Sequence, residues 1–290
     1  MIVRILDVVI AGLLLGGIYA MIAVGLSLQY GVARVLNVAH GEFIMIGAFA
    51  AWMLYTGLGI SPLIALAICG PVGFAVGYGL HRTLFKRLRV SSPSPAAFQG
   101  SSMLASFGLL FIIQNIALLI WGGSLRGYSY MSFPVNFGGA IFAANRLVTA
   151  FFAVVIGVAF YIFLARTRLG KAIRAAAQDP ETAGLMGVNI SQVLALCFGL
   201  GALMAGFGGV LVSMCFSTIQ PAMGFQYTII ALIVIVLGGL GSIPGSFIGG
   251  FVLGLVGSIV SHWQPALSLA AYYMLFIVLL IAKPTGILGK

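Results

Sequence analysis

The residues that could perform chemistry are few, and one stretch holds a third of the charged ones. Positions 166–189 hold four of the fourteen basic residues and two of the four acidic residues of this 290-residue chain. Read as a helix, Lys171, Arg174 and Gln178 are spaced three and four residues apart, so they share one face. We expect this charged face to lie outside the bilayer, between two membrane spans.

A second short helix is predicted directly after this face. Pro180 suits the first turn of a helix, Asp179 before it can act as the N-cap, and Glu181 lies at the positive end of the helix dipole. Gly187 and Asn189 tolerate the left-handed backbone that ends a helix. The two helices are expected to form a compact hairpin. A solvated loop that only sets topology would also explain this pattern.

Another group of polar residues lies at positions 30–52, between apolar runs. Asn37, His40 and Glu42 would be costly in hydrocarbon, so they occupy either a short polar connection or a protein-enclosed cavity. Asn37 can cap a helix that begins near Val38, which leaves Glu42 in or just beyond its first turn. A capping role and a part in a translocation path both remain open. His40 is expected to be a hydrogen-bonded packing residue, since no second ligand supports a metal site.

Enzymatic chemistry is poorly supported by these residues. His40 and Glu42 are two positions apart and point away from each other on a helix, and no Ser/His/Asp set or metal cluster is evident. No Walker-type loop occurs, so we expect a protein that is not an enzyme and binds no cofactor itself. An ion-driven secondary transporter would need acids within its spans, and only Glu42 qualifies. The isolated cysteines are expected to be small core residues: Cys69, Cys197 and Cys215.

The elements that must position these residues are membrane spans. The chain is 62% hydrophobic and 6% charged, whereas about a quarter of the residues in a soluble domain are charged. Apolar runs of 16–25 residues, without strand-period alternation, predict an all-α polytopic fold of about 8–10 membrane segments, some broken by Gly and Pro. We expect one transmembrane domain, residues 1–290, that includes the loop 166–189. The net charge of +10 arises at span ends, which favours membrane topology over nucleic-acid binding.

Basic residues at the span ends predict the topology. The segments 82–89 and 166–189 and the C-terminal tail hold ten of the fourteen basic residues, so we place all three on the cytoplasmic side. Nine spans are then expected, with the N-terminus outside. A broken helix near 31–41, or a re-entrant segment near 238–245, would change that number. The predicted spans lie at 8–28, 30–52, 61–80, 103–121, 146–165, 190–213, 227–237, 246–258 and 267–282.

Small residues repeat at every fourth position in three of these spans. One stripe is Gly12, Gly16 and Ala20, the second includes Gly201, Ala205 and Gly209, and the third includes Gly250 and Gly254. Such stripes allow two helices to approach closely. The glycine-rich run also invites a nucleotide-binding interpretation, but no strand precedes it and no GxGxxG or GxxxxGK[ST] spacing occurs. Helix packing is therefore the interpretation that we adopt.

Five segments, in order along the chain, carry a family resemblance. They are YGVARVLNVAHGEFIMIGAF (30–49), SFGLLFIIQN (106–115), RTRLGKAIRAAAQDPETAGLMGVN (166–189), VLGGLGSIPGSFIGG (236–250) and KPTGILG (283–289). With them the sequence resembles the integral-membrane permeases of ABC importers for branched-chain amino acids, specifically the shorter of the two permease types. The segments span nearly the whole chain, so the resemblance is domain-wide.

The resemblance implies one half of a membrane heterodimer in the bacterial cytoplasmic (inner) membrane. The expected partners are a related permease, two cytoplasmic ATPase subunits that use ATP and Mg, and a periplasmic or extracellular solute-binding protein. The helix at 180–186 would dock in a groove on an ATPase and transmit its closure to the spans. The residues expected to couple the subunits are Lys171, Arg174, Gln178, Asp179, Pro180, Glu181, Leu185, Met186 and Gly187.

The resemblance determines the substrate and the translocation path less well. Members of the family often carry a lysine in the helix before GGLGS and an acid in the helix after it, whereas this chain has neither at 224–236 or 246–262. Branched-chain amino acids are the first expectation, and urea, short amides or aromatic acids are alternatives. A remote alternative is an ion-coupled transporter that uses Glu42. The candidate pathway residues are Asn37, His40, Glu42, Gln114 and Asn115.

Overall fold

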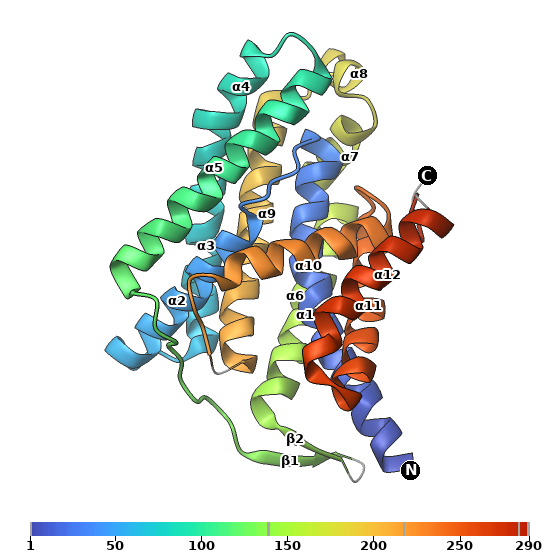
Figure 1. Ribbon diagram of the computed structural model, residues 1–290. Helices are drawn as coiled ribbons and strands as arrows, with labels where there is room; N and C mark the ends of the chain where they lie inside the picture. The colour runs from blue at the N-terminus through green and yellow to red at the C-terminus, as the bar shows by residue number, and fades with distance from the viewer. Residues whose placement is uncertain (1, 138–139, 217, 284, 289–290) are drawn as a thin grey trace.

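The computed structural model describes residues 2–137, 140–216, 218–283 and 285–288, and it shows a bundle of helices (Figure 1). Within this described part, eight helical segments are long and apolar enough to cross a membrane. This number confirms the all-α, polytopic fold expected from the sequence. A short antiparallel hairpin of two strands was not expected.

The elements follow the order of the predicted spans. The eight membrane-crossing segments are formed by α1 (Ile2–Ala33), α2 (His40–Leu58), α3 (Pro62–Leu80) with its extension, α5 (Pro95–Trp121), α6 (Ala144–Arg166), α9 (Ile190–Cys215), α11 (Ile243–Trp263) and α12 (Ser268–Ala282) together with the turn directly before it, an eighteen-residue segment. The shorter elements are the π-helical turn η1 (His81–Phe85), α4 (Lys86–Ser91), β1 (Pro134–Phe137), β2 (Ala140–Ala143), α7 (Arg168–Gln178), α8 (Pro180–Leu185), α10 (Met223–Gly238) and the 3-10 turn η2 (Pro265–Leu267).

Local sequence explains where several of these helices begin. The side chains of Ser61, Ser94, Asn189 and Ser242 each accept a hydrogen bond from a backbone N–H in the first turn of the helix that follows. Three of these four helices also have a proline in the first turn, where the missing N–H costs no hydrogen bond. The loops therefore encode the starts of the spans.

One predicted span, at 227–237, differs from the others. The helix there, α10, has sixteen residues and is too short to count among the eight. Figure 1 shows it running across the bundle, from the start of α2 towards α11 and α12. It ends at Gly239 and Gly241, whose φ angles of +104° and +83° favour glycine. The expected Gly/Pro break thus lies between α10 and α11.

The two ends of the bundle agree with the predicted topology. α4, α7 and α8 lie at one end and the N-terminus lies at the other (Figure 1). The residues after α12 return to the turn between α10 and α11, where the Ile287 amide donates to the Leu237 carbonyl at 2.8 Å. The basic segments 82–89 and 166–189 therefore share one end, which the positive-inside rule assigns to the cytoplasm.

The predicted small-residue stripes lie at helix crossings. On α9, a Cβ added to Gly201 would collide with a side chain of α1, and one added to Gly209 would collide with the backbone of α2. Ala205 between them is fully buried. On α11, a Cβ added to Gly250 or Gly254 would collide with the backbone of α1. Backbone therefore packs directly on backbone at Gly209, Gly250 and Gly254, whereas Gly201 makes room for a side chain of α1.

Candidate functional site

The hairpin of α7 and α8 is built by two side-chain caps. The Thr167 hydroxyl accepts the Gly170 N–H at 3.0 Å and starts α7. Asp179 starts α8, because its Oδ1 accepts the N–H of Glu181 at 3.0 Å and that of Thr182 at 3.1 Å. The Thr182 hydroxyl donates to the other carboxylate oxygen. This hydroxyl, followed by the backbone N–H groups, holds the pKa of Asp179 below its ordinary value.

Three buried apolar side chains and one guanidinium group attach the hairpin to the spans. Ile173, Ala176 and Ala183 are buried, and α7 packs against α1, α6 and α9. The Arg174 guanidinium donates to the carbonyl of Ala165 on α6 at 3.1 Å. Arg174 therefore positions the hairpin on this chain, in addition to contributing charge.

The outer face of the hairpin presents apolar side chains to solvent. Leu185 is 89% exposed and Met186 is 81% exposed, although both are large and apolar. Gly187 next to them has φ of +87°, which closes the turn. The other predicted coupling residues are also exposed, apart from the half-buried Pro180. An exposed apolar tip with a charged rim on a rigid support is suited to docking against another protein.

The second feature is an irregular segment, residues 34–39, enclosed between α1 and α2. The Val38 amide donates to Ser106 on α5 at 3.1 Å. The Gly41 amide donates at 2.8 Å to the hydroxyl of Thr228 on α10, which in turn donates to the Val38 carbonyl at 3.0 Å. Side chains from neighbouring helices thus satisfy the backbone where the helix is broken, as membrane depth requires.

The prediction that Asn37 is the N-cap of α2 is wrong. α2 begins at His40, its N-cap is Ala39, and no side chain caps it. Asn37 instead accepts the Ala39 amide at 3.2 Å and donates at 3.2 Å to Gln29, which donates to the carbonyl of Phe198 on α9 at 3.3 Å. Asn37 cannot act as the N-cap because the chain is not yet helical at Val38, and its side chain links three segments of the core.

Glu42 and His40 lie inside the subunit. Both are completely buried, and Nε2 of His40 lies 3.2 Å from the carbonyl oxygen of Ile22, so His40 is a packing residue. Glu42 is in the first turn of α2 and lies against Gly224 in the first turn of α10. Its carboxylate oxygens have no hydrogen-bond partner within the described ranges. The positive ends of two helices, α2 and α10, meet at this carboxyl group.

The remaining pathway candidates are elsewhere. Gln114 is half-buried on α5, and the exposed Asn115 donates to the Phe111 carbonyl of its own helix at 2.8 Å. The structure therefore does not gather the five predicted pathway residues into one cavity. Gln29, Ser106 and Thr228 were missed by sequence reasoning. Each is a polar residue within an apolar span, which is the signal that could have identified them.

A cavity of about 810 Å³ opens at the end of the bundle opposite to α8. Tyr19, Tyr227 and Tyr272 line it together with Arg146 and His262. The hydroxyl groups of Tyr19 and Tyr272 lie 3.4 Å apart. Sequence reasoning did not single out these residues as a group, because they come from five separate helices.

These features define a multi-pass α-helical membrane protein with broken interior helices and a rigid hairpin at its basic end. The chain belongs to the family described as branched-chain amino acid transport system / permease component, whose model matches residues 8–282. This match confirms the resemblance inferred from the five segments. The family assignment also agrees with the absence of a catalytic constellation from the sequence.

Relatives of known name cover almost the whole chain. The chain is 33% identical to the high-affinity branched-chain amino acid transport system permease protein LivH of Escherichia coli K12, over 96% of this chain and 94% of the relative. It is 33% identical to BraD of Pseudomonas aeruginosa, over 98% and 96%. The ribose import permease protein RbsC of E. coli K12 is 24% identical, over 89% and 78%. No solved structure matches this chain.

Proposed function

We propose that this chain is the membrane-spanning permease subunit of an ATP-driven ABC importer of the bacterial inner membrane. The proposed substrates are branched-chain amino acids or related small polar solutes, moved by alternating access. Membership of the permease family over residues 8–282 is the observation that carries the proposal. The chain itself catalyses no reaction in this proposal, since ATP and Mg are used by two cytoplasmic ATPase partners.

The α7–α8 hairpin is the proposed point of attachment for one ATPase. Leu185 and Met186 supply the apolar contact, because they are the most exposed large apolar side chains of the hairpin. Lys171 and Glu181 lie at its rim and orient the partner. The contacts of α7 with α1, α6 and α9 would convert a movement of the ATPase into a movement of the spans. The translocation path is proposed to lie at the interface with a related permease subunit.

The proposed substrate is supported by the names of the relatives. LivH and BraD are named for branched-chain amino acid transport at 33% identity, whereas the ribose permease is more distant at 24%. Urea, short amides and aromatic acids remain alternatives, because a separate solute-binding protein is expected to choose the solute. Ion-coupled transport through Glu42 is disfavoured, since that carboxyl group is fully buried between α2 and α10.

Co-purification tests the proposed assembly. The chain is expressed with the products of its neighbouring genes, and wild type is compared with a Leu185→Asp/Met186→Asp variant. Each buried apolar side chain is worth about 1.5–3 kcal/mol, so the variant should lose at least about tenfold in bound ATPase and keep the second permease. Val90→Asp on α4 is a matched control, because Val90 and Met186 are both 81% exposed. Wild type that purifies alone, or equal ATPase recovery from all variants, would contradict the proposal.

Uptake into proteoliposomes tests the energy source and the substrate. The purified assembly with its binding protein should accumulate leucine only when ATP is present on the ATPase side, and valine and isoleucine should compete. Competition by urea or benzoate alone would move the assignment to one of the alternatives. A Glu42→Gln variant that loses uptake together with a proton or sodium dependence would support the ion-coupled mechanism instead.

A further inference from the structure

The cavity of about 810 Å³ at the end of the bundle opposite to α8 is called the outer cavity below. Its volume is typical of a small-molecule site, for which about 300–1,000 Å³ is usual. Along α1 its lining extends from Asp7 to Tyr19, and α1 is one continuous helix over these residues. Twelve residues of helix rise about 18 Å, slightly more than the roughly 15 Å of hydrocarbon in one leaflet. The outer cavity therefore reaches from its mouth to about the middle of the membrane.

Tyrosine side chains and α10 form the inner end of the outer cavity. Tyr19 and Tyr272 are buried, and their hydroxyl groups lie 3.4 Å apart. Tyr227 and Ile230 line the cavity from α10, the helix that crosses the bundle (Figure 1). The Tyr227 hydroxyl forms no hydrogen bond with any residue that the structure describes. The inner end thus offers a free hydroxyl group beside an apolar surface.

Two opposite charges line the mouth of the outer cavity. Among its described lining residues, Asp7 on α1 is the one acid, and Arg146 in the first turn of α6 is the one Lys or Arg. α1 packs against β2, the strand directly before α6, so the two side chains come from neighbouring elements. Neither side chain forms an ion pair or a hydrogen bond within the described ranges. Both charges are therefore available to a solute.

An α-amino acid carries the two charges that complement this pair. Its carboxylate suits Arg146, because the guanidinium group can donate two parallel hydrogen bonds, and its ammonium group suits the Asp7 carboxylate. A carboxylic acid without an amine would pair only Arg146, and urea or an amide would pair neither charge. One and two turns deeper than Asp7, Ala11 and Leu15 provide an apolar lining for the side chain of the solute.

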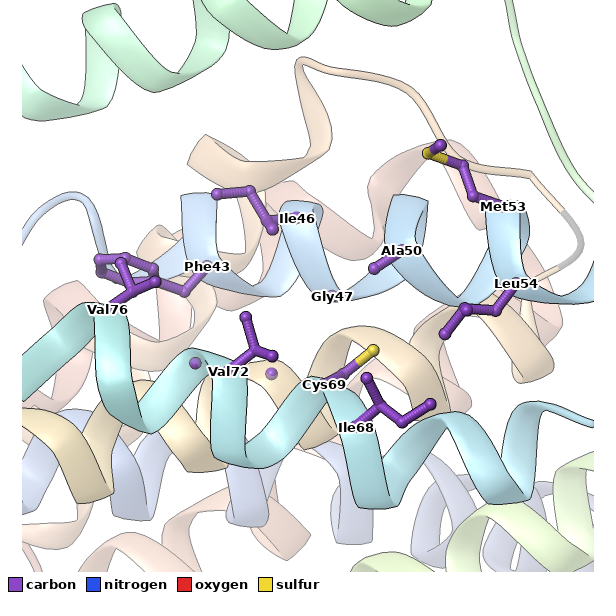
Figure 2. A pocket seen from close by; sticks show the side chains of 12 residues that line it. Phe43, Ile46, Gly47, Ala50, Met53, Leu54, Ile68, Cys69, Val72 and Val76 are labelled. Carbon is purple, nitrogen blue, oxygen red and sulfur yellow. The ribbon is translucent and has the colours of Figure 1, made fainter. Parts of the chain in front are cut away.

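Two other cavities lack this combination. The groove of about 280 Å³ between α2 and α3 is lined by apolar side chains, apart from the thiol of Cys69 (Figure 2). A zwitterion placed there would lose its hydration without gaining a partner. The cavity of about 320 Å³ beneath the hairpin includes Arg174 but no acid among its described lining residues. Of these three cavities, the outer cavity alone offers a partner to both charges of a zwitterion.

We propose that the outer cavity is a binding site for a zwitterionic amino acid with an apolar side chain. Arg146 binds the carboxylate, Asp7 binds the ammonium group, and the side chain of the solute lies against Ala11 and Leu15. This inference rests on the proposed function, because it takes the chain to be the permease of a small-solute importer. Since the cavity opens at the outer end, it receives the solute before the path between the two permease subunits.

Ligand binding without the solute-binding protein tests the site. The chain is purified with its permease and ATPase partners, placed in lipid nanodiscs and titrated with three ligands. These are leucine, leucinol, which lacks the carboxylate, and 4-methylpentanoate, which lacks the ammonium group. Saturation-transfer NMR measures the three dissociation constants. Wild type should bind leucine at least about tenfold more tightly than either analogue, since each analogue leaves one charge of the site unpaired.

Two substitutions should each abolish one of these preferences. Arg146→Gln should bind leucine and leucinol within about twofold of each other and still prefer leucine to 4-methylpentanoate. Asp7→Asn should show the opposite pattern, which a general loss of stability would not produce. Arg126→Gln is the control at the same end of the bundle, because the Arg126 guanidinium lies 5.5 Å from the centroid of the Trp52 ring and does not line the outer cavity. It should keep both preferences.

Several outcomes would overturn the proposed site. They are no leucine binding by wild type, equal affinity of wild type for the three ligands, and unchanged preferences or equal weakening of all ligands in both variants. ATP-driven leucine uptake by the same wild-type assembly, with its solute-binding protein, is measured in parallel. Uptake without the reciprocal binding pattern would refute the site and leave the importer assignment standing. The reciprocal pattern without ATP-driven uptake would support the site and refute the importer assignment.

Discussion

Replacing Gly254 by alanine should weaken the contact between α11 and α1. A Cβ at Gly254 would collide with backbone atoms of Gly16 and with the carbonyl oxygen of Gly12. Because these are backbone atoms, no side chain can rotate away and the two helices must move apart. Overpacking of this kind costs about 1–3 kcal/mol.

Gly108 on α5 provides a matched control for this substitution. Apart from its own helix, no described atom lies within 4 Å of a Cβ built at Gly108. Both substitutions replace glycine by alanine within a helix, so both gain about 1 kcal/mol of helix propensity. The difference between the two variants therefore isolates the overpacking term. It should be about 1–3 kcal/mol, or about 2–12 °C in Tm for a chain of this size.

Thermal unfolding of the two purified variants in one detergent, followed by circular dichroism, measures this difference. Equal Tm values for Gly254→Ala and Gly108→Ala would refute the inference that backbone contact limits the α1–α11 distance. Gly254→Leu should go further and reduce the yield of assembled transporter, while the substrate preference of the assembled fraction stays the same. A normal yield of the leucine variant would contradict the same inference.

Three further predictions concern single side chains. Thr228→Val should lower the free energy of unfolding by about 2–5 kcal/mol, because the Gly41 amide and the Val38 carbonyl lose their partner. Thr83→Val is the control, since the Thr83 hydroxyl bonds only to carbonyls of its own helix. It should cost less than about 1 kcal/mol in the same thermal unfolding assay. Asp179→Ala should accelerate hydrogen exchange at the start of α8. Because hydrogen bonds lower the pKa of Asp179, its cap is at full strength above the ordinary carboxyl pKa and is lost as pH falls through the lowered value; Asp179→Asn should lack this acid dependence. Tyr128→Phe should cost about 1 kcal/mol by removing a hydrogen bond to α9. Burial raises the pKa of Tyr128 to about 12, so its contribution to stability is complete below about 10 and falls as pH rises towards 12, a loss that the phenylalanine variant should not show.

Sequence reasoning located most helices and the hairpin, but it placed some boundaries wrongly. Ser/Pro and Asn caps are local signals, so the starts of α3, α5 and α9 could be recognised from neighbouring residues. The start of α2 could not. Asn37 has the right chemistry for a cap, yet its side chain donates to Gln29 on α1, which is itself held by the carbonyl of the distant Phe198 on α9. A one-dimensional pattern cannot show that competition.

In the candidate site, too, local features could be predicted from the sequence and contacts between helices could not. The order of residues in 166–189 predicted Asp179 as the cap of α8, because a cap involves residues only two or three positions apart. The sequence could not show that Arg174 would bond to Ala165, or that Leu185 and Met186 would be left exposed. Those outcomes depend on how α7 and α8 pack onto α6 and α9.

The sequence by itself determined the class of protein and the set of apolar helices, and its pattern of basic residues predicted the side on which the hairpin lies. It did so because hydrocarbon penalises every charge and every unpaired backbone group, and this penalty acts on each segment separately. Only the tertiary structure decided that Glu42 is enclosed beside Gly224 and that α10 crosses the bundle. The physical reason is that these arrangements depend on contacts between helices far apart in the chain, where the presence or absence of a single Cβ determines how closely two backbones can approach.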